Sequence, residues 1–341
     1  MKWFKRILIA CLVLVLLVVG GLASYILLKG RAPARRPDLV TPLAEGIPPA
    51  PHGYPSEYSA FLMAYLFYDL IDIENYPTPP DVIEKTDIVF GKGGDTPLVL
   101  DVYSTAQEGA ARPAIIIFYG GSWKGGNKEQ LKCYAVHFAQ QGYVAVTPQY
   151  RLKKAGEWPN SVQDAKCAVR WLRSHAEEYG VDPDRIGVMG NSAGAYLALM
   201  VAYTPEVEDF EGDGGWEETS SAVKAVVEIY GPTDFTDPAR RDHNALVDYM
   251  GGHYEQDPDR FVAASPVNYV TAQSPPTCII HGTVDMLVPV QHGDGLAEKL
   301  KAAGVPYVYS RINGWPHAMD AVASVNEHSR ALALDFFNTH L

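Results

Sequence analysis

The sequence predicts an α/β protein in which a mostly parallel central sheet carries helices on both faces. Short apolar runs alternate with amphipathic stretches from residue 87 to the C-terminus, and this alternation is typical of parallel sheets. Residues 114–119 form an unbroken apolar run, as expected of a strand that is buried on both faces. The chain has 341 residues, 47% of them hydrophobic, which is enough for one large domain and an N-terminal extension.

The expected elements follow one another in a regular order. Strands are predicted at residues 87–90, 98–103, 114–119, 143–147, 185–189, 223–230, 277–281 and 307–312, with a Gly-rich turn at 91–94. Helices are predicted at residues 159–179, 193–203, 296–303 and 329–337. An acidic surface loop (206–221) and a small insertion (236–276) interrupt this order. The insertion precedes a late strand, so it either shapes a pocket at the carboxyl ends of the strands or is an ordinary surface excursion.

The first 29 residues are typical of a transmembrane anchor or a secretory signal. Residues 7–28 are uncharged and almost wholly apolar, and Lys2, Lys5 and Arg6 precede them. About 22 residues at 1.5 Å each span roughly 33 Å, which is enough to cross a bilayer. An uncleaved anchor is the first interpretation and a cleaved signal the second, because most signal cores are shorter. We therefore expect a membrane-anchored or secreted protein whose main domain lies outside the cytoplasm.

A proline-rich linker and a helix are predicted between this segment and the main domain. Residues 30–56 contain seven prolines, a density that blocks helix and favours an extended, semi-rigid spacer. The main domain is then expected at residues 57–341. Its first part, residues 57–80, is predicted as an accessory helix that is apolar and aromatic over residues 57–76. This helix either docks on the domain or contacts a membrane or substrate.

Charge and cysteine spacing exclude some functions. The formal net charge of −12 argues against a nucleic-acid partner, because phosphate binding needs clustered Lys and Arg. Cys133, Cys167 and Cys278 lie far apart in apolar stretches, so they are predicted to be buried thiols. No closely spaced Cys or His pair suggests zinc. We expect neither a metal nor an organic cofactor.

A candidate nucleophile lies in the motif G-x-S-x-G, which is Gly190-Asn191-Ser192-Ala193-Gly194 in this chain. The predicted strand 185–189 enters the motif and the Ala-rich helix 193–203 leaves it. The nucleophile elbow of the α/β-hydrolase fold needs this strand–turn–helix arrangement, in which small residues allow a sharp turn. The sequence therefore predicts that Ser192 is the nucleophile, exposed at one edge of the sheet.

The acid and the base are expected downstream, in the chain order Ser, acid, His. Asp285 follows the predicted strand 277–281, and His317 follows the predicted strand 307–312. The carboxyl ends of parallel strands meet at one edge, so both side chains are expected to lie near Ser192. Three rival candidates fit less well. Asp234 comes too early after the turn of its strand, His281 lies within a strand end, and His292 lies at the start of a helix.

Backbone groups after the strand 114–119 are predicted to form an oxyanion hole. Gly121 and Ser122 lie in a Gly-rich loop at the end of this strand. Their N–H groups, with that of Ala193 after the nucleophile, are expected to bind a developing oxyanion. The same loop also resembles a phosphate-binding loop, but it misses the G-x-x-x-x-G-K-[ST] pattern by one residue and lacks the hydroxyl residue for Mg²⁺.

These motifs together resemble the α/β-hydrolase esterases related to hormone-sensitive lipase and the bacterial feruloyl and acetyl esterases. The motifs are FYGGSW, VTPQYRL, VQDAKCAVRWLR, DRIGVMGNSAGAYLALM, HGTVDMLVP and GWPH, in that order from residue 87 onward. The resemblance implies an α/β-hydrolase fold, and it assigns the same triad and oxyanion donors. Two positions depart from the family pattern: Tyr119 replaces the usual His, and Asn191 replaces the Asp or Glu of many relatives.

The predicted activity is hydrolysis of a carboxylic ester through an acyl-enzyme intermediate. Substrates would be small-molecule, lipid or carbohydrate esters. An amidase or peptidase on the same fold is the alternative enzyme, because amides and esters share a tetrahedral intermediate. The alternative of another class is a catalytically silent, membrane-anchored binding protein.

Overall fold

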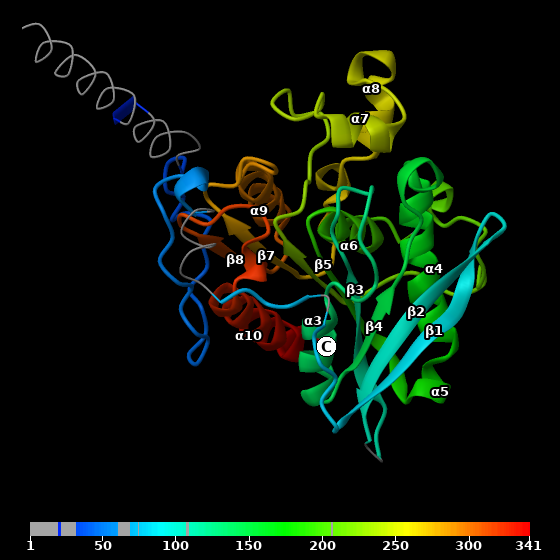
Figure 1. Ribbon diagram of the computed structural model, residues 1–341. Helices are drawn as coiled ribbons and strands as arrows, with labels where there is room; N and C mark the ends of the chain where they lie inside the picture. Colours follow the sequence, from blue (N-terminus) through cyan, green and yellow to red (C-terminus); the bar gives the residue numbers. More distant parts are fainter. Residues whose placement is uncertain (1–19, 22–31, 61–68, 74, 107–108, 206) are drawn as a thin grey trace, which may run out of the picture.

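A single sheet of eight strands organises the part of the chain that the structure describes (Figure 1). The computed structural model describes residues 20–21, 32–60, 69–73, 75–106, 109–205 and 207–341. The strand order is β1-β2-β4-β3-β5-β6-β7-β8, antiparallel at β1–β2 and β2–β4 and parallel elsewhere. The strands are Val82–Gly93 (β1), Thr96–Thr105 (β2), Arg112–Phe118 (β3), Val144–Pro148 (β4), Val181–Asn191 (β5), Ala225–Ile229 (β6), Thr277–Gly282 (β7) and Tyr307–Ile312 (β8). The predicted mostly parallel sheet is confirmed.

Helices cover both faces of this sheet. They are Lys132–Gln140 (α3), Asn160–Ser174 (α4), Ala176–Tyr179 (α5), Ala193–Tyr203 (α6), Asn244–Met250 (α7), Pro258–Ala263 (α8), Gln291–Ala303 (α9) and Ala323–His340 (α10). Gly187 and Gly190 both belong to β5. A Cβ on Gly187 would meet α10, whereas one on Gly190 would meet α6. Residues three apart on a strand point to opposite faces, so α10 and α6 lie on opposite sides of the sheet. On the first side α3 packs on α10, where the rings of Phe138 and Phe337 are 5.8 Å apart.

Several elements differ from the expectation in their bounds. The predicted helix 159–179 is two helices, because His175 between α4 and α5 leaves helical geometry (φ −105°, ψ 17°). Strand β1 continues through Gly91–Gly93, so the turn comes later than predicted. Helix α3 has no counterpart in the prediction. Six of its nine residues are buried, which leaves almost no polar face to reveal a helical period.

The proline-rich segment is not a free spacer. Residues 32–60, called the N-terminal strap below, have irregular structure with turns up to residue 56 and lie against the main domain. Leu39 is buried in the common core. The backbone N–H of Thr41 donates to Tyr309 O at 3.3 Å, and Tyr54 N–H donates to Gly314 O at 2.8 Å. Residues 32–55 contain no helix, but prolines do not reveal that the segment packs along β8 and the loop after it.

The predicted accessory helix is only partly present. Residues 57–60 are helical, and residues 61–68 lie outside the described residues. Residues 69–73 and 75–80 are not helical, so the expected continuation to residue 76 is wrong. The physical reason is pairing with another segment: Ile71 N–H donates to Ala321 O, and Ala323 N–H donates to Asp69 O, both at 2.9 Å. A helix would use these backbone groups internally.

The predicted anchor or signal also falls almost wholly outside the described residues, since only Gly20 and Gly21 of the run 7–28 are described. Within the described ranges, no helix has both the length and the apolar character needed to cross a bilayer.

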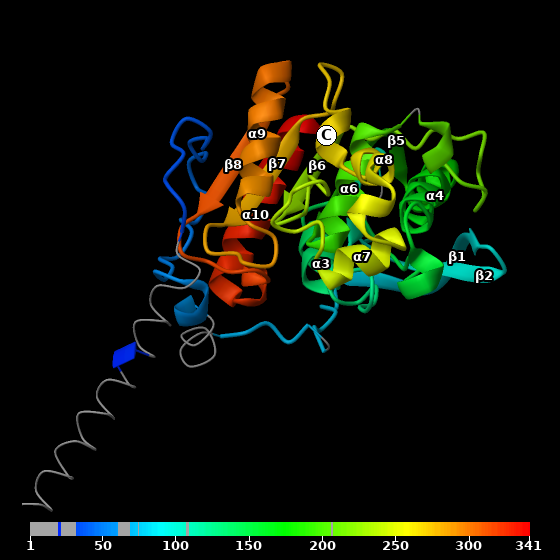
Figure 2. The ribbon, with the colours of Figure 1, turned by 90° about the horizontal axis from the view of Figure 1, so that it is seen from above.

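The insertion 236–276 contains α7, α8 and two short 3₁₀ turns, Tyr254–Gln256 and Pro266–Tyr269. Figure 1 shows α7 and α8 projecting beyond one edge of the sheet, and Figure 2 shows them from above, near α6. Tyr249 of α7 stacks on Trp123, with ring centroids 4.0 Å apart. Trp123 belongs to the loop after β3, so the insertion packs against the predicted oxyanion loop.

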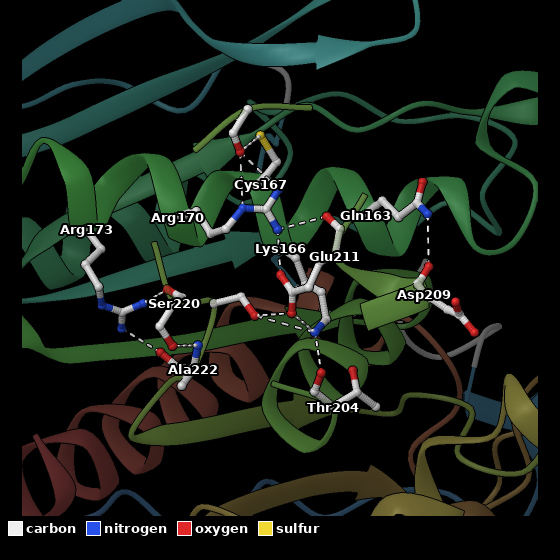
Figure 3. Close-up of polar contacts among 12 residues, drawn as sticks. Gln163, Lys166, Cys167, Arg170, Arg173, Thr204, Asp209, Glu211, Ser220 and Ala222 are labelled. Carbon is white, nitrogen blue, oxygen red and sulfur yellow. Dashed lines mark hydrogen bonds and ion pairs between the residues drawn. The ribbon is translucent and has the colours of Figure 1, made fainter. Parts of the chain in front are cut away.

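The acidic loop 206–221 is bound to helix α4 by ion pairs (Figure 3). Glu211 accepts Lys166 Nζ–H at 2.6 Å through Oε1, and Arg170 Nη1–H at 2.6 Å through Oε2. Lys166 and Arg170 are buried side chains of α4. Burial lowers the pKa of Lys166, and its hydrogen bond to Glu211 opposes this change. One carboxylate thus pairs with two buried cations.

Glu211→Gln is expected to lower the free energy of unfolding by about 3–5 kcal/mol, because it leaves the buried cations Lys166 and Arg170 without a counter-charge. Urea denaturation measures the change. The matched control is Glu218→Gln at an exposed position of the same loop, where a change within about 0.5 kcal/mol is expected. Equal stabilities of the two variants would show that Glu211 has no such role.

Candidate active site

Ser192 lies in a sharp turn between β5 and α6. Its backbone angles, φ 52° and ψ −121°, are rare for a residue with a side chain. A Cβ on Gly194 would lie 2.0 Å from Phe118 O, and one on Gly190 would lie 2.4 Å from the Gly194 carbonyl carbon. Side chains at these two positions are therefore excluded by the backbone of β3 and α6. This is the geometry that the G-x-S-x-G motif predicts.

The structure brings together the three side chains predicted as nucleophile, base and acid. His317 Nε2 lies 2.9 Å from Ser192 Oγ, and His317 Nδ1 lies 2.7 Å from Asp285 Oδ2. An ionised carboxylate only accepts hydrogen bonds, so Nδ1 carries the proton and Nε2 presents its lone pair to the serine hydroxyl. The imidazole is thus oriented to take a proton from Ser192.

The Asp285 carboxylate is fixed by its own turn. Its Oδ1 accepts the N–H groups of Leu287 at 2.9 Å and Val288 at 2.8 Å. The side chain is completely buried, whereas that of His317 is 11% exposed. Asp285 is therefore held on the side of His317 that faces away from Ser192, and one edge of the imidazole remains open to a substrate.

The rival residues of the sequence analysis make other contacts. His281 Nε2 donates to Val288 O at 2.8 Å, and burial lowers the pKa of this histidine. His292 Nδ1 accepts the N–H groups of Thr233 at 3.2 Å and Asp234 at 3.3 Å. Burial lowers the pKa of His292 to about 4, so this ring is neutral at pH 7. Both histidines support loops at the strand ends.

The three backbone N–H groups predicted to form the oxyanion hole belong to residues that line the cavities at Ser192. Gly121 has φ 129° and Ser122 has φ 54°, and a Cβ on Gly121 would lie 2.2 Å from Gly125 O. Within the described part of the chain, the N–H groups of Gly121, Ser122 and Ala193 donate to no acceptor. Gly121 and Ser122 line one cavity with Ser192. Their donors are thus free for an oxygen atom bound beside the serine.

Asn191, one of the two departures from the family pattern, faces a buried carboxylate. Its Nδ2 donates to Tyr230 Oη at 3.0 Å and to Asp320 Oδ2 at 3.3 Å. Tyr230 also donates to Asp320, and its ring centroid lies 4.7 Å from that of His317. Burial raises the pKa of Asp320, whereas the Tyr230 hydrogen bond lowers it. An acid at position 191 would meet Asp320 with like charge, so an amide fits better.

Sequence reasoning does not reveal Tyr230 and Asp320. The only available signals are positional, since Tyr230 ends a predicted strand and Asp320 follows His317 by three residues. At the other departure, the Tyr119 ring stacks on Tyr150 at 4.4 Å, and Tyr119 O accepts the Tyr150 hydroxyl at 2.7 Å. The loop keeps its backbone donors although the usual histidine is absent.

Two cavities meet at Ser192. The smaller has a volume of about 50 Å³ and is lined by Ala193, Trp123, Phe235 and Leu246, among others. The larger has a volume of about 330 Å³. Its lining includes His317 and the polar side chains of Gln130, Asn191, Tyr230 and Asn326. The insertion 236–276 contributes Leu246 to the smaller cavity. Of the two alternatives for this insertion, a pocket-forming segment or a surface excursion, the structure therefore favours the first. In the described ranges no cluster of His, Cys, Asp or Glu is arranged to hold a metal ion.

The fold and this arrangement of side chains define an α/β-hydrolase. The family model BD-FAE matches residues 100–300, and the chain belongs to this family. The predicted resemblance to α/β-hydrolase esterases is thereby confirmed.

Curated relatives and solved structures agree with this placement. The chain is 32% identical to the probable carboxylic ester hydrolase LipM and 30% identical to esterase LipQ, both of Mycobacterium tuberculosis. These alignments cover 75% and 79% of this chain but only 61% and 65% of the relatives' lengths. Esterase 2 of Thermogutta terrifontis with bound propionate is 30% identical (TM-score 0.64), covering 77% of this chain and 96% of that one. A truncated carbohydrate esterase from gut microbiota is 25% identical (TM-score 0.68), covering 77% and 99%.

A buried acid lies beneath the loop that forms part of the smaller cavity. Glu228 of β6 is fully buried, and its Oε2 accepts Gly231 N–H at 2.7 Å. Its Oε1 has no hydrogen-bond partner in the described part of the chain. Burial raises the pKa of Glu228 to about 8 from the usual value of 4.5. The folded protein therefore binds one more proton than the unfolded chain between these two pH values.

Glu228→Gln is expected to become more stable relative to the parent protein as the pH rises from about 5 to 8. The contribution of Glu228 is fully present below its unfolded pKa and is lost as the pH rises through the folded pKa, whereas Gln does not titrate. Urea denaturation at several pH values measures the difference in free energy of unfolding. The control is Glu217→Gln at an exposed position, whose stability should follow that of the parent protein at every pH. If the difference in free energy of unfolding between Glu228→Gln and the parent protein did not change with pH, the raised pKa would be contradicted.

Proposed function

We propose that this chain is a serine hydrolase that cleaves carboxylic esters through an acyl-enzyme intermediate. The observation that carries the proposal is the hydrogen-bonded series Ser192–His317–Asp285 beside the unpaired N–H groups of the oxyanion loop. The similarity to LipM, LipQ and the solved esterase of Thermogutta terrifontis supports the same chemistry. No specific contact favours an amide or a silent site.

Each group has a definite task in this reaction. His317 Nε2 takes the proton of Ser192 Oγ, and Oγ attacks the ester carbonyl. The N–H groups of Gly121, Ser122 and Ala193 stabilise the oxyanion that forms. His317 then protonates the leaving alcohol, and the acyl group stays on Oγ. A water molecule, deprotonated by His317, then attacks the acyl carbonyl; the bond to Oγ breaks, His317 returns the proton to Oγ, and the acid is released. Asp285 stabilises the imidazolium in both halves of the reaction.

The two cavities support an assignment of the two ends of the ester. The leaving oxygen must receive a proton from His317, so the alcohol lies on the side that His317 lines, which is the larger, polar cavity. The acyl group then enters the smaller cavity, where Trp123, Phe235 and Leu246 contact it. A volume of about 50 Å³ accommodates a short acyl group. We therefore propose short-chain acyl esters as substrates.

The test is hydrolysis of p-nitrophenyl acetate, butyrate and octanoate by the parent protein and by Ser192→Ala. We expect kcat/KM to be highest for the two short esters. Ser192→Ala should lose at least about a thousandfold in kcat, because the remaining groups cannot form an acyl-enzyme. Equal thermal denaturation of the two proteins is the control for folding. Undiminished turnover in Ser192→Ala would contradict the mechanism. A preference for octanoate would contradict the assignment of the acyl group to the smaller cavity.

We also propose that residues 7–28 direct the protein to a membrane, as an anchor or as a cleaved signal. The support is the length and the uncharged character of this run. In a bacterial host, an anchored full-length chain should stay in the membrane fraction after carbonate extraction. A chain with a cleaved signal should instead be exported without its N-terminal segment. The mass of the protein distinguishes the two. Leu14→Arg with Leu17→Arg should abolish both results, because each central charge costs about 2.5–3.5 kcal/mol on insertion. A parent protein found soluble and intact in the cytoplasm would contradict the proposal.

A further inference from the structure

The N-terminal strap contacts the loop that carries the candidate base. Besides the hydrogen bond from Tyr54 N–H to Gly314 O, the indole Nε1–H of Trp315 donates to Pro51 O at 2.9 Å. A Cβ on Gly53 would lie 2.2 Å from Asn313 O. Strap and loop thus lie backbone to backbone at Asn313 and Gly314, three to four residues before His317.

The strap also contacts the turn that carries the candidate acid. Glu57 Oε1 accepts the backbone N–H of Met286 at 3.1 Å. Leu287 and Val288, which follow, donate to the carboxylate of Asp285 itself, and Val284, which precedes, donates to Trp315 O at 3.2 Å. Among these backbone N–H groups, from residues 284 and 286–288, that of Met286 therefore has its acceptor on the strap.

Glu57 lies within range of the charges of the site. Burial raises the pKa of Glu57, the Met286 N–H lowers it, and Asp285, His317 and Arg240 also act on it. A half-buried carboxylate beside Asp285 is unfavourable by itself. Its hydrogen bond to the acid-bearing turn gives a reason for its position.

We propose that Glu57 is a positioning residue of the active site, which holds the acid-bearing turn at a fixed distance from the base-bearing loop. Only five residues lie between Pro51 and Glu57, so the strap joins both loops over a short length of chain. The orientation of Asp285 toward His317 depends on the turn from residue 285 to 288. A small shift of such a turn reduces catalysis strongly, because the imidazole loses its orientation. This inference rests on the proposed hydrolase function.

The experiment compares Glu57→Ala with Glu57→Gln, whose side-chain oxygen still accepts a hydrogen bond. For Glu57→Ala we expect kcat for p-nitrophenyl acetate to fall about five- to tenfold with KM unchanged, because a hydrogen bond is lost and no substrate contact is removed. Glu57→Gln should keep more than about half of the parent kcat. Glu45→Ala, at an exposed position of the same strap, should match the parent protein.

Amide hydrogen exchange provides a readout that does not depend on activity. In the full-length protein, the peptide that contains Met286 should exchange about tenfold faster in Glu57→Ala, and at nearly the parent rate in Glu57→Gln. Parent exchange rates in Glu57→Ala would overturn the inference, as would an equal loss of kcat in both variants, because the acceptor would then not matter. If the parent protein hydrolyses no ester, the proposed function fails, and the exchange result still decides whether Glu57 holds the turn.

Discussion

The contact between the β5–α6 turn and the end of β3 is the constraint on which the candidate site depends. The backbone at Gly194 lies so close to Phe118 O that no side chain fits between them. This contact forces Ser192 into its rare conformation and places the serine directly beside Gly121 and Ser122, which follow β3. A nucleophile and its oxyanion donors therefore meet because two neighbouring strands end together, and neither requires a flexible loop to find the other.

The parallel sheet explains why the sequence predicts so much of the site. Ser192, Asp285 and His317 follow β5, β7 and β8, and parallel strands end at one edge, so local patterns were sufficient to place them. The bounds of β8 and α6 agree with the prediction for the same reason, since both have clear apolar patterns with distinct ends. The strap, Glu57 and the pairing of Asp69 with Ala323 could not be predicted, because each depends on a partner about 230 to 270 residues away.

Polar groups beneath the site show a second level of organisation. Asn191 donates to Asp320, Tyr230 does the same, and the Tyr230 ring lies against His317. The amide at position 191 is thus matched by an acid elsewhere in the fold, Asp320. The loop chemistry of such a site has to be judged from the whole network, because one residue of a motif does not fix the charge around the imidazole.

The strap has a consequence for the sheet that is separate from catalysis. β8 is an outer strand of the sheet, and such a strand offers unpaired N–H and C=O groups to any other extended chain. At Tyr309 both groups are occupied by the strap: the carbonyl accepts Thr41 N–H at 3.3 Å, and the N–H donates to Thr41 Oγ1 at 2.7 Å. The two prolines that flank this contact, Pro37 and Pro42, cannot donate to a further strand. The strap thus covers part of an outer strand that could otherwise pair with another chain, and the strap is itself a poor template for β-pairing.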